Sequence, residues 1–182
     1  PEEALEHVHR IQTGVAHMQA LIDELLTFAR LEAGREHAEV ETVAPAELAR
    51  EAARLVDGAA REGGLDLLLD TQDGLPDLRT DGRRVVQLLV NLLGNAIKYT
   101  DEGEVALRVE STGDHCLFHV IDTGIGIAGE HLEQVFEPFW RAPRSGGDRR
   151  GTGLGLAVAR QTARLLDGDI EVWSLEDEGS RF

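Results

Sequence analysis

The sequence has 182 residues, of which 42% are hydrophobic and only 4% are aromatic, and its net charge is −16. This length allows one domain with a proper core plus an appended segment. An acidic surface repels phosphate backbones, so we expect no nucleic-acid binding. No apolar stretch approaches the length of a bilayer span, and the single cysteine fits a reducing compartment. We therefore expect a cytoplasmic portion without direct membrane contact, whose parent is free to carry a membrane segment upstream.

The first 34 residues have the pattern of one long helix. Its apolar residues step alternately by four and three, which is the spacing of a coiled-coil seam: Ala4, Val8, Ile11, Val15, Met18, Ile22, Leu25 and Ala29. The pattern stops at Gly34, a typical residue for a helix C-terminus. Such a seam needs a partner helix. Because no second heptad pattern follows, we expect the partner to lie upstream or in another chain.

After Gly34, helical patterns alternate with short strand patterns. Expected strands cover residues 37–43, 65–69, 104–110, 116–121 and 170–174, and a last strand is cut short at Phe182. Expected helices cover residues 46–61, 81–97, 130–136 and 154–166. Helices interleaved with hairpin strands favour an α+β fold, a two-layer α/β sandwich preceded by the long helix.

Four residues of rare types fall within nine positions. Lys98 is the only lysine, Tyr99 the only tyrosine, and Asn91 and Asn95 are the only asparagines. On a helix they share one face, while the leucines between them point into the core. Neutral amide oxygens are hard ligands that suit Mg²⁺, and lysine supplies a point charge for phosphate. The alternative, a solvated polar face, would not need such rare types.

Two glycine-rich motifs follow. Asp122-Thr123-Gly124-Ile125-Gly126 comes directly after an apolar strand. A carboxylate there can accept a hydrogen bond from an exocyclic amine such as that of adenine, and glycine lets backbone approach a planar base. The segment 151–155, Gly-Thr-Gly-Leu-Gly, precedes a helix whose N-terminus favours an anion. Each motif is weak alone, and neither is a P-loop or a convincing dinucleotide fingerprint.

An aromatic stretch and a basic stretch separate the two glycine motifs. We expect Phe136 and Phe139 to anchor the aromatic stretch. Beyond it, residues 141–150 hold four arginines against one aspartate, a composition that suits a nucleotide-facing loop. Because residues 142–150 have few apolar side chains, we expect them to be a mobile lid that nucleotide orders. An ordinary surface loop is the alternative.

Together, over nearly the whole chain, these motifs resemble the sensor histidine kinase family. NLLGNAIKYT is similar to its N box, DTGIGI to its first glycine box, FEPFWR to its F box and GTGLGL to its second glycine box. LLTFARLEAG resembles the end of the second dimerisation helix. The resemblance implies a Bergerat-type ATP-binding fold. It makes residues 1–34 the end of the dimerisation and phosphoacceptor domain, and residues 35–182 the catalytic domain with its last strand truncated.

The resemblance also implies roles for the residues of the N box. Asn95 would coordinate Mg²⁺, and Asn91 would support the metal through water or phosphate. Lys98 would contact phosphate, and Tyr99 would lie along the nucleotide. The expected catalytic residues are Asn91, Asn95 and Lys98.

The glycine boxes receive their implied roles in the same way. Asp122 would bind the adenine amine, and Gly124 and Gly126 would approach the base. The second glycine box would shape the phosphate end of the lid through Gly151, Thr152, Gly153, Leu154 and Gly155.

The family's phosphoacceptor motif, the H box, is absent. His7, His9 and His17 lie on the first helix without the acid and proline that follow the family's histidine. The expected partners are therefore the parent's own H-box domain and a response regulator, in a homodimeric parent that uses ATP and Mg²⁺. The γ-phosphoryl group would pass to a histidine outside this chain.

Two alternatives to a kinase have the same motifs. Hydrolases of this fold, such as DNA gyrase, mismatch-repair ATPases and heat-shock chaperones, place a glutamate as general base where Asn91 stands. Asparagine cannot accept the proton, so water attack would lose a factor of about 10²–10⁴. A degenerate module that binds nucleotide and signals only through dimer contacts is the second alternative, and phosphotransfer to a supplied histidine domain would separate it from a kinase.

Overall fold

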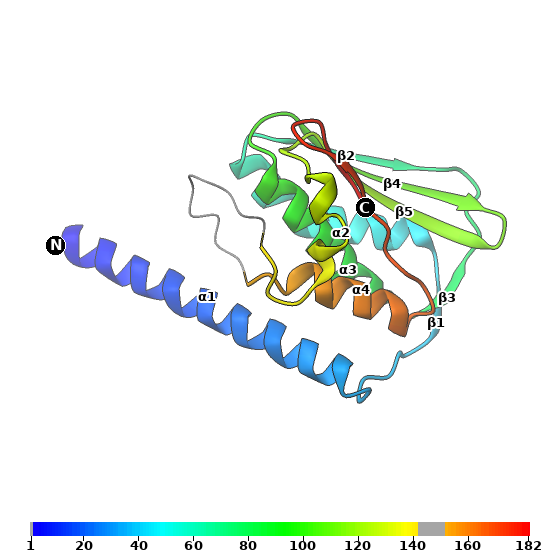
Figure 1. Cartoon of the computed structure of the whole chain (residues 1–182), viewed down its shortest axis with the longest axis horizontal. Coiled ribbons are helices and arrows are strands. Elements are labelled where there is room, and N and C mark those ends of the chain that lie inside the picture. The colour runs from blue at the N-terminus through cyan, green and yellow to red at the C-terminus, as the bar shows by residue number, and fades with distance from the viewer. Residues whose placement is uncertain (1, 142–151) are drawn as a thin grey trace.

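The computed structural model describes residues 2–141 and 152–182, and it describes the side chains of the first helix at positions 14, 15, 18, 19 and from 21 onward. The first helix, α1 (Glu2–Glu32), is a single 31-residue helix that extends well beyond the rest of the molecule (Figure 1). Gly34 follows it with a φ of 60°, which favours glycine. Among the described helices, none is long and apolar enough to cross a bilayer.

The C-terminal part of α1 packs on the body of the protein through polar contacts. Glu24 accepts a hydrogen bond from Thr152, which precedes α4 (Gly155–Leu165), and Glu32 accepts one from Gln161 within that helix. Part of the apolar seam of α1 faces away from these contacts. The exposed residues of the seam are Val15, Met18, Ile22 and Leu25. Within the described chain this seam has no partner helix, so the expectation of a partner elsewhere stays a prediction.

The central sheet has five strands in the order β2-β4-β5-β7-β6. These are β2 (Asp66–Thr71), β4 (Glu104–Thr112), β5 (His115–Asp122), β6 (Trp173–Leu175) and β7 (Gly179–Arg181). β2 is parallel to β4, and the other neighbours are antiparallel. The pairing of β7 with β5 places Ser180 opposite Asp122. This register brings the last residues of the chain to the end of β5.

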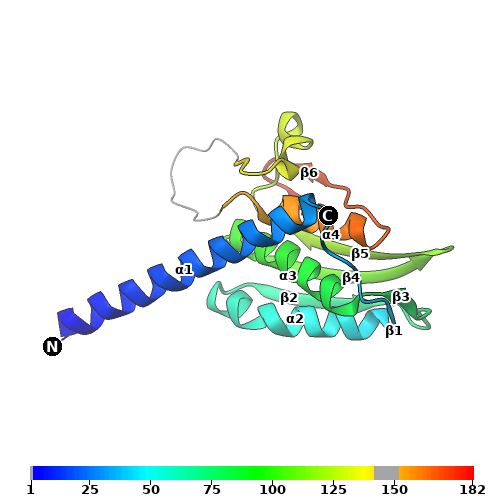
Figure 2. The ribbon, with the colours of Figure 1, turned by 90° about the horizontal axis from the view of Figure 1, so that it is seen from below.

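The helices α2 (Pro45–Glu62), α3 (Gly82–Tyr99) and α4 cover one face of the sheet (Figure 2), as a two-layer sandwich requires. α2, expected at residues 46–61, has its proline in the first turn, where proline is well tolerated. α3 begins after Asp81, whose side chain accepts the Arg84 backbone N–H at 3.2 Å. Between the helices and the sheet lies a core made mostly of leucine, valine and alanine, in which Leu93, Val105, Leu107, Val109 and Val120 are fully buried. The predicted fold class is confirmed.

Several predicted boundaries were wrong. A three-residue strand, β3 (Leu78–Thr80), pairs with β1 (Glu41–Val43) and was not predicted, since three residues carry too little pattern. The strand expected at 37–43 reduces to β1, because Glu39 donates its backbone N–H to Asp81 instead of to a strand. The strand expected at residues 170–174 begins only at Trp173 and ends at Leu175.

The helix expected at 130–136 is two separate 3₁₀ turns, η1 (Gly129–His131) and η2 (Gln134–Phe136). Glu137 has an extended backbone, with a ψ of 137°, because the ring of Pro138 disfavours helical backbone at the residue before it. The aromatic stretch therefore leaves η2 as irregular chain and is free to turn back toward α4.

Candidate functional site

The C-terminal half of α3 separates an apolar face from a polar one, as predicted. Leu92, Leu93 and Ala96 are buried in the core. The four rare residues, Asn91, Asn95, Lys98 and Tyr99, are all half-buried on the other side of the helix. The ammonium of Lys98 lies 4.7 Å from the centroid of the Tyr99 ring. The helix thus holds two amides and one cation in a single partly shielded surface.

The N-terminus of α4 lies beside this surface. A Cβ built at Gly155 would lie 3.7 Å from the amide nitrogen of Asn95, so the first residue of α4 is within van der Waals reach of that amide. The first amide groups of a helix have no partner within the helix, so a helix start of this kind favours an anion. The structure therefore brings the second glycine box against the N box, although about 60 residues of sequence separate them.

The second glycine box is shaped by short contacts on both sides. Leu154 is buried, and its N–H donates to the hydroxyl of Thr152 at 3.0 Å. Thr152 in turn donates to Glu24 of α1. Gly153 has a φ of 74°, and a Cβ there would lie 2.7 Å from the Trp140 carbonyl oxygen. Gly151 and the expected lid at 142–150 lie outside the described residues.

Asp122 ends β5 as a buried carboxylate, with 6% of the residue exposed. Burial raises its pKa, while hydrogen bonds from the Gly124 backbone and from both the backbone and the hydroxyl of Ser180 oppose that rise. The Gly124 N–H lies 2.9 Å from Oδ1. Several donors from the protein thus hold the carboxylate in one orientation.

The loop after Asp122 is fastened to the end of α3. The Ile125 N–H donates to the Tyr99 carbonyl oxygen at 3.2 Å. Gly124 passes so close to the same carbonyl that a Cβ would lie 2.3 Å from its oxygen. Gly126 has a φ of 62°, and a Cβ there would lie 1.9 Å from the Leu175 carbonyl oxygen. Both glycines are therefore required by close backbone approach, and the N box and first glycine box are adjacent.

Sequence reasoning missed the serines that support this loop. Ser180 donates to Asp122, and Ser174 accepts the Ile127 N–H at 2.8 Å. Both serines belong to the C-terminal strands, and isolated serines near a chain end form no recognisable motif. Only the pairing of β7 with β5 brings them to the site.

Of the two phenylalanines in the aromatic stretch, residues 136–141, only Phe136 is anchored through its ring. Phe136 packs edge-to-face on Phe182, with ring centroids 6.4 Å apart, as the sequence predicted. The prediction for Phe139 was wrong, because its residue is 61% exposed and its φ is 64°. Its N–H donates to the Gly153 carbonyl at 3.0 Å, so the backbone, rather than the ring, ties the stretch to the second glycine box. Trp140 stacks in a tilted arrangement on His131.

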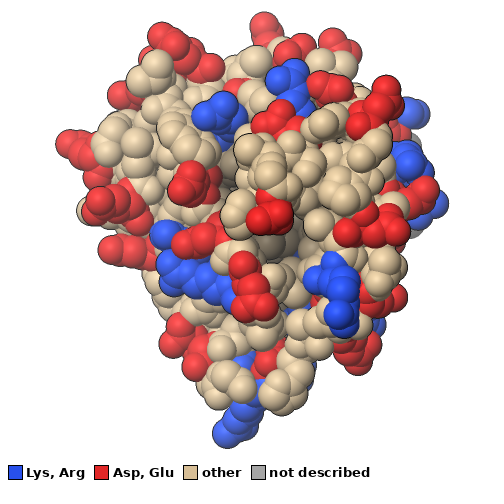
Figure 3. All heavy atoms as spheres, turned by 90° about the vertical axis from the view of Figure 1, so that its right-hand side faces the viewer, with Lys and Arg blue, Asp and Glu red and all other residues tan. Residues whose placement is uncertain are grey.

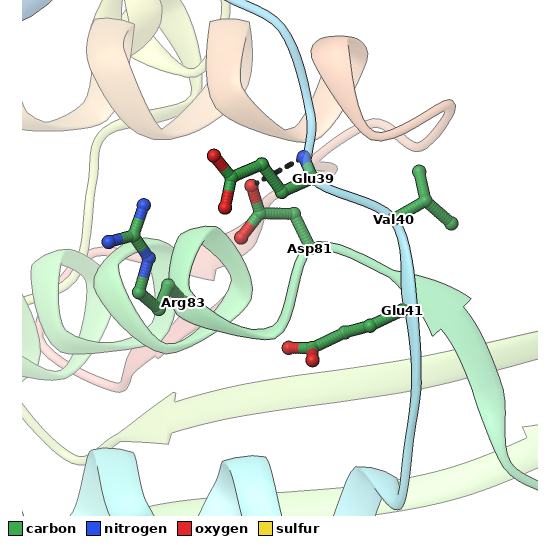
Figure 4. Close-up of a pocket in the computed structure, with 5 residues that line it drawn as sticks. All are labelled: Glu39, Val40, Glu41, Asp81 and Arg83. Atoms are coloured by element: carbon green, nitrogen blue, oxygen red, sulfur yellow. Dashed lines mark hydrogen bonds between the residues drawn. The ribbon is translucent and has the colours of Figure 1, made fainter.

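A hollow at the other end of α3 does not belong to this site. It is lined by Glu39, Val40, Glu41, Asp81 and Arg83, where the chain entering β1 passes the N-terminus of α3 (Figure 4). Burial alone would raise the pKa of Asp81, but the backbone N–H groups of Glu39 and Arg84 lower it overall. These groups join the linker after α1 to the helix cap.

The surface around that end of the molecule carries interspersed acidic and basic side chains (Figure 3). Arg84 binds Glu36 at 2.5 Å and approaches Asp81 at 3.2 Å, so the charges near the helix cap are largely paired. Among the described residues, no group of histidine, cysteine or acidic side chains could hold a metal ion.

The sequence profile of the histidine kinase-, DNA gyrase B- and HSP90-like ATPases matches residues 80–182. The matched segment contains α3, both glycine boxes and the C-terminal strands. It therefore includes every residue that the structure brings together around Asn95 and Asp122.

Individual proteins of known type are also similar. The circadian input-output histidine kinase CikA of Synechococcus elongatus is 36% identical over 187 residues, which cover 100% of this chain and 24% of CikA. The crystal structure of full-length ShkA in complex with AMPPNP has a TM-score of 0.87 at 30% identity, and the match covers 97% of this chain and 37% of ShkA. The catalytic domain of the histidine kinase ThkA has a TM-score of 0.69 at 28% identity, covering 79% of this chain and 92% of ThkA. The chain thus spans about a quarter of the length of CikA.

Proposed function

Because the chain belongs to the family of histidine kinase-, DNA gyrase B- and HSP90-like ATPases and carries the ATP-binding catalytic domain of its histidine kinases, we propose that it positions Mg-ATP for phosphoryl transfer. The γ-phosphoryl group passes to a histidine on a separate phosphoacceptor domain, and from there to a response regulator. In this proposal residues 1–34 are the end of the dimerisation helix, and residues 35–182 are the catalytic domain. The observation that carries the proposal is the convergence of Asn95, Asp122 and the N-terminus of α4.

Adenine recognition falls to Asp122 and its loop. The buried, oriented carboxylate accepts the exocyclic amine, which guanine and hypoxanthine lack at the corresponding position. Gly124 and Gly126 let the loop pack directly on the backbone of Tyr99 and Leu175, which fixes the loop beside which the base would lie. Tyr99 lies at the end of α3 next to this loop and supports the nucleotide from that side.

In this proposal the polar face of α3 and the start of α4 bind the phosphates and the metal. Amide oxygens suit Mg²⁺, which keeps several waters and takes ligands from the substrate phosphates. Asn95 would hold the metal with support from Asn91, and Lys98 would bind phosphate. Thr152, Gly153, Leu154 and Gly155 present the helix N-terminus, and Gly151 precedes them. When bound, Mg²⁺ supplies neutralisation of the charge that develops on the transferred group.

Transfer to histidine, rather than to water, is favoured by the residue at position 91. A hydrolase needs a base that activates water, and the amide of Asn91 cannot accept a proton. Among the described residues of the polar face of α3, none is acidic. The phosphoacceptor partner must therefore bring its own nucleophile, and the exposed seam of α1 suits a homodimeric parent in which dimerisation helices pack together.

We expect Asp122→Ala to weaken ADP binding by about 10- to 100-fold, because a hydrogen bond to a buried charged group contributes about 1.5–3 kcal/mol. Isothermal titration calorimetry with ADP and Mg²⁺ measures the change. Asp114→Ala, which removes an equal charge from the exposed β4–β5 turn, serves as the control and should bind like the unaltered chain. Equal affinity of the Asp122 variant and the control would remove Asp122 from its proposed role.

A further inference from the structure

The C-terminal hairpin, β6 and β7 with their turn, is in close backbone contact with the loop that follows Asp122. The Asp177 N–H donates to the Ile125 carbonyl oxygen at 2.9 Å. Gly179 has a φ of 102°, and a Cβ there would lie 2.0 Å from the Asp122 carbonyl oxygen. With Gly126 pressed against Leu175, the loop is held along its whole length. Its position therefore depends on the hairpin.

Ser174 is the side chain through which the hairpin reaches the loop. Its neighbours Trp173 and Leu175 are exposed, whereas Ser174 turns inward. Its hydroxyl accepts the Ile127 N–H at 2.8 Å and donates to the Gly179 carbonyl oxygen at 2.7 Å. One hydroxyl thus joins the far end of the loop to the start of β7.

The hydroxyl of Ser174 also contacts the hydroxyl of Ser180. The two serine oxygens lie 3.1 Å apart. The carboxylate of Asp122 is a stronger acceptor than the hydroxyl of Ser174, so the Ser180 proton goes to Asp122, and the Ser180 oxygen can accept the one proton that Ser174 shares between it and the Gly179 carbonyl. Two serines therefore form a chain of hydrogen bonds from Ile127 to Asp122.

We propose that Ser174 is a positioning residue for adenine recognition, which holds Ser180 and the loop so that the carboxylate of Asp122 stays aimed at the exocyclic amine. The inference rests on the proposed function, in which Asp122 accepts that amine. Ser174 itself contacts protein groups, so its removal should affect selection among bases rather than binding of the phosphates.

The test compares ADP with inosine diphosphate, which carries a carbonyl in place of the exocyclic amine, by calorimetry with Mg²⁺. We expect the unaltered chain to prefer ADP by about tenfold or more, the value of one hydrogen bond to a charged acceptor. Ser174→Ala should weaken ADP binding by about tenfold and inosine diphosphate binding by less than about twofold, so that the preference disappears. Ser174→Thr keeps a hydroxyl and should retain the preference.

Ser111→Ala, at the far end of β4, is the matched control and should change neither affinity. Ser180→Ala removes the second hydroxyl of the hydrogen-bond network and should abolish the preference for ADP, as Ser174→Ala does. The proposal therefore stays testable if one of the two variants does not fold. Equal weakening of both nucleotides in Ser174→Ala and Ser180→Ala, or an unchanged ratio, would overturn the role of Ser174. An unaltered chain that binds both nucleotides equally would overturn the role of Asp122 itself.

Discussion

With γ-labelled ATP and Mg²⁺, we expect the chain alone to show negligible self-phosphorylation and slow ATP hydrolysis, and to label a supplied H-box domain from the same parent. Transfer depends on placing a nucleophile in line with the γ-phosphate and on neutralising charge. In the proposed function Asn95 and Lys98 neutralise the charge, whereas Asn91 offers no base for water. The measurement is radiolabel on the supplied domain, with the acid lability that marks phosphohistidine.

The controls for this experiment lie on α3 and on a distant turn. Asn95→Ala should reduce labelling of the supplied domain at least about 100-fold if the amide positions the metal, since misplacement of a reacting group has effects of that size. Asp114→Ala should leave labelling unchanged. Stable labelling of His7, His9 or His17 in the chain alone would contradict an external acceptor. Rapid phosphate release that persists in Asn91→Ala would instead favour a hydrolase.

The parts of the site that the sequence predicted are those set by local chemistry. Asp81 caps α3, and helical periodicity then fixes which way Asn91 and Asn95 face, because the leucines between them must be buried. The glycines at 124 and 126 predicted a close backbone approach to a base, which stays a prediction, and the structure shows that both also pack against protein carbonyls. A helix face or a tight turn is specified within a few residues, so one sequence suffices to find it.

The parts that the sequence did not predict depend on contacts between distant segments. Ser180 reaches Asp122 only through the pairing of β7 with β5, and a three-residue strand has too little periodicity to predict that register. Phe139 has an apolar side chain, yet the link from its N–H to Gly153 holds its backbone at positive φ and its ring outward. At Phe139 the backbone hydrogen bond, rather than the hydrophobicity of the side chain, determines where the ring lies.

The docking of α1 is of the same non-local kind. Its heptad pattern predicted the helix and its exposed seam, but nothing in that pattern specifies where Glu24 and Glu32 contact α4. Thr152, a residue of the second glycine box, thereby depends on α1 as well as on its own loop. Polar pairs between a surface helix and a loop leave no periodic signal that sequence reasoning could detect.

We expect Gly126→Ala to lower the free energy of unfolding by about 3 kcal/mol or more and to abolish measurable ADP binding. Alanine at a φ of 62° costs about 1–2 kcal/mol, and its Cβ would lie 1.9 Å from the Leu175 carbonyl oxygen. Backbone cannot rotate away as a side chain can, so the loop and the β6–β7 hairpin must separate, with a further cost of about 1–3 kcal/mol. Denaturant unfolding measures the stability, and calorimetry measures the binding.

Gly58→Ala is the matched control, because Gly58 lies on the exposed side of α2 with nothing within 4 Å of an added Cβ. There the same substitution should stabilise the protein by about 0.5–1 kcal/mol, since alanine is the better helix former, and should leave ADP binding unchanged. A Gly126→Ala variant as stable as the unaltered chain would show that the loop and hairpin separate without cost. If that variant also bound ADP normally, the close packing of the hairpin on the loop would have no part in nucleotide binding.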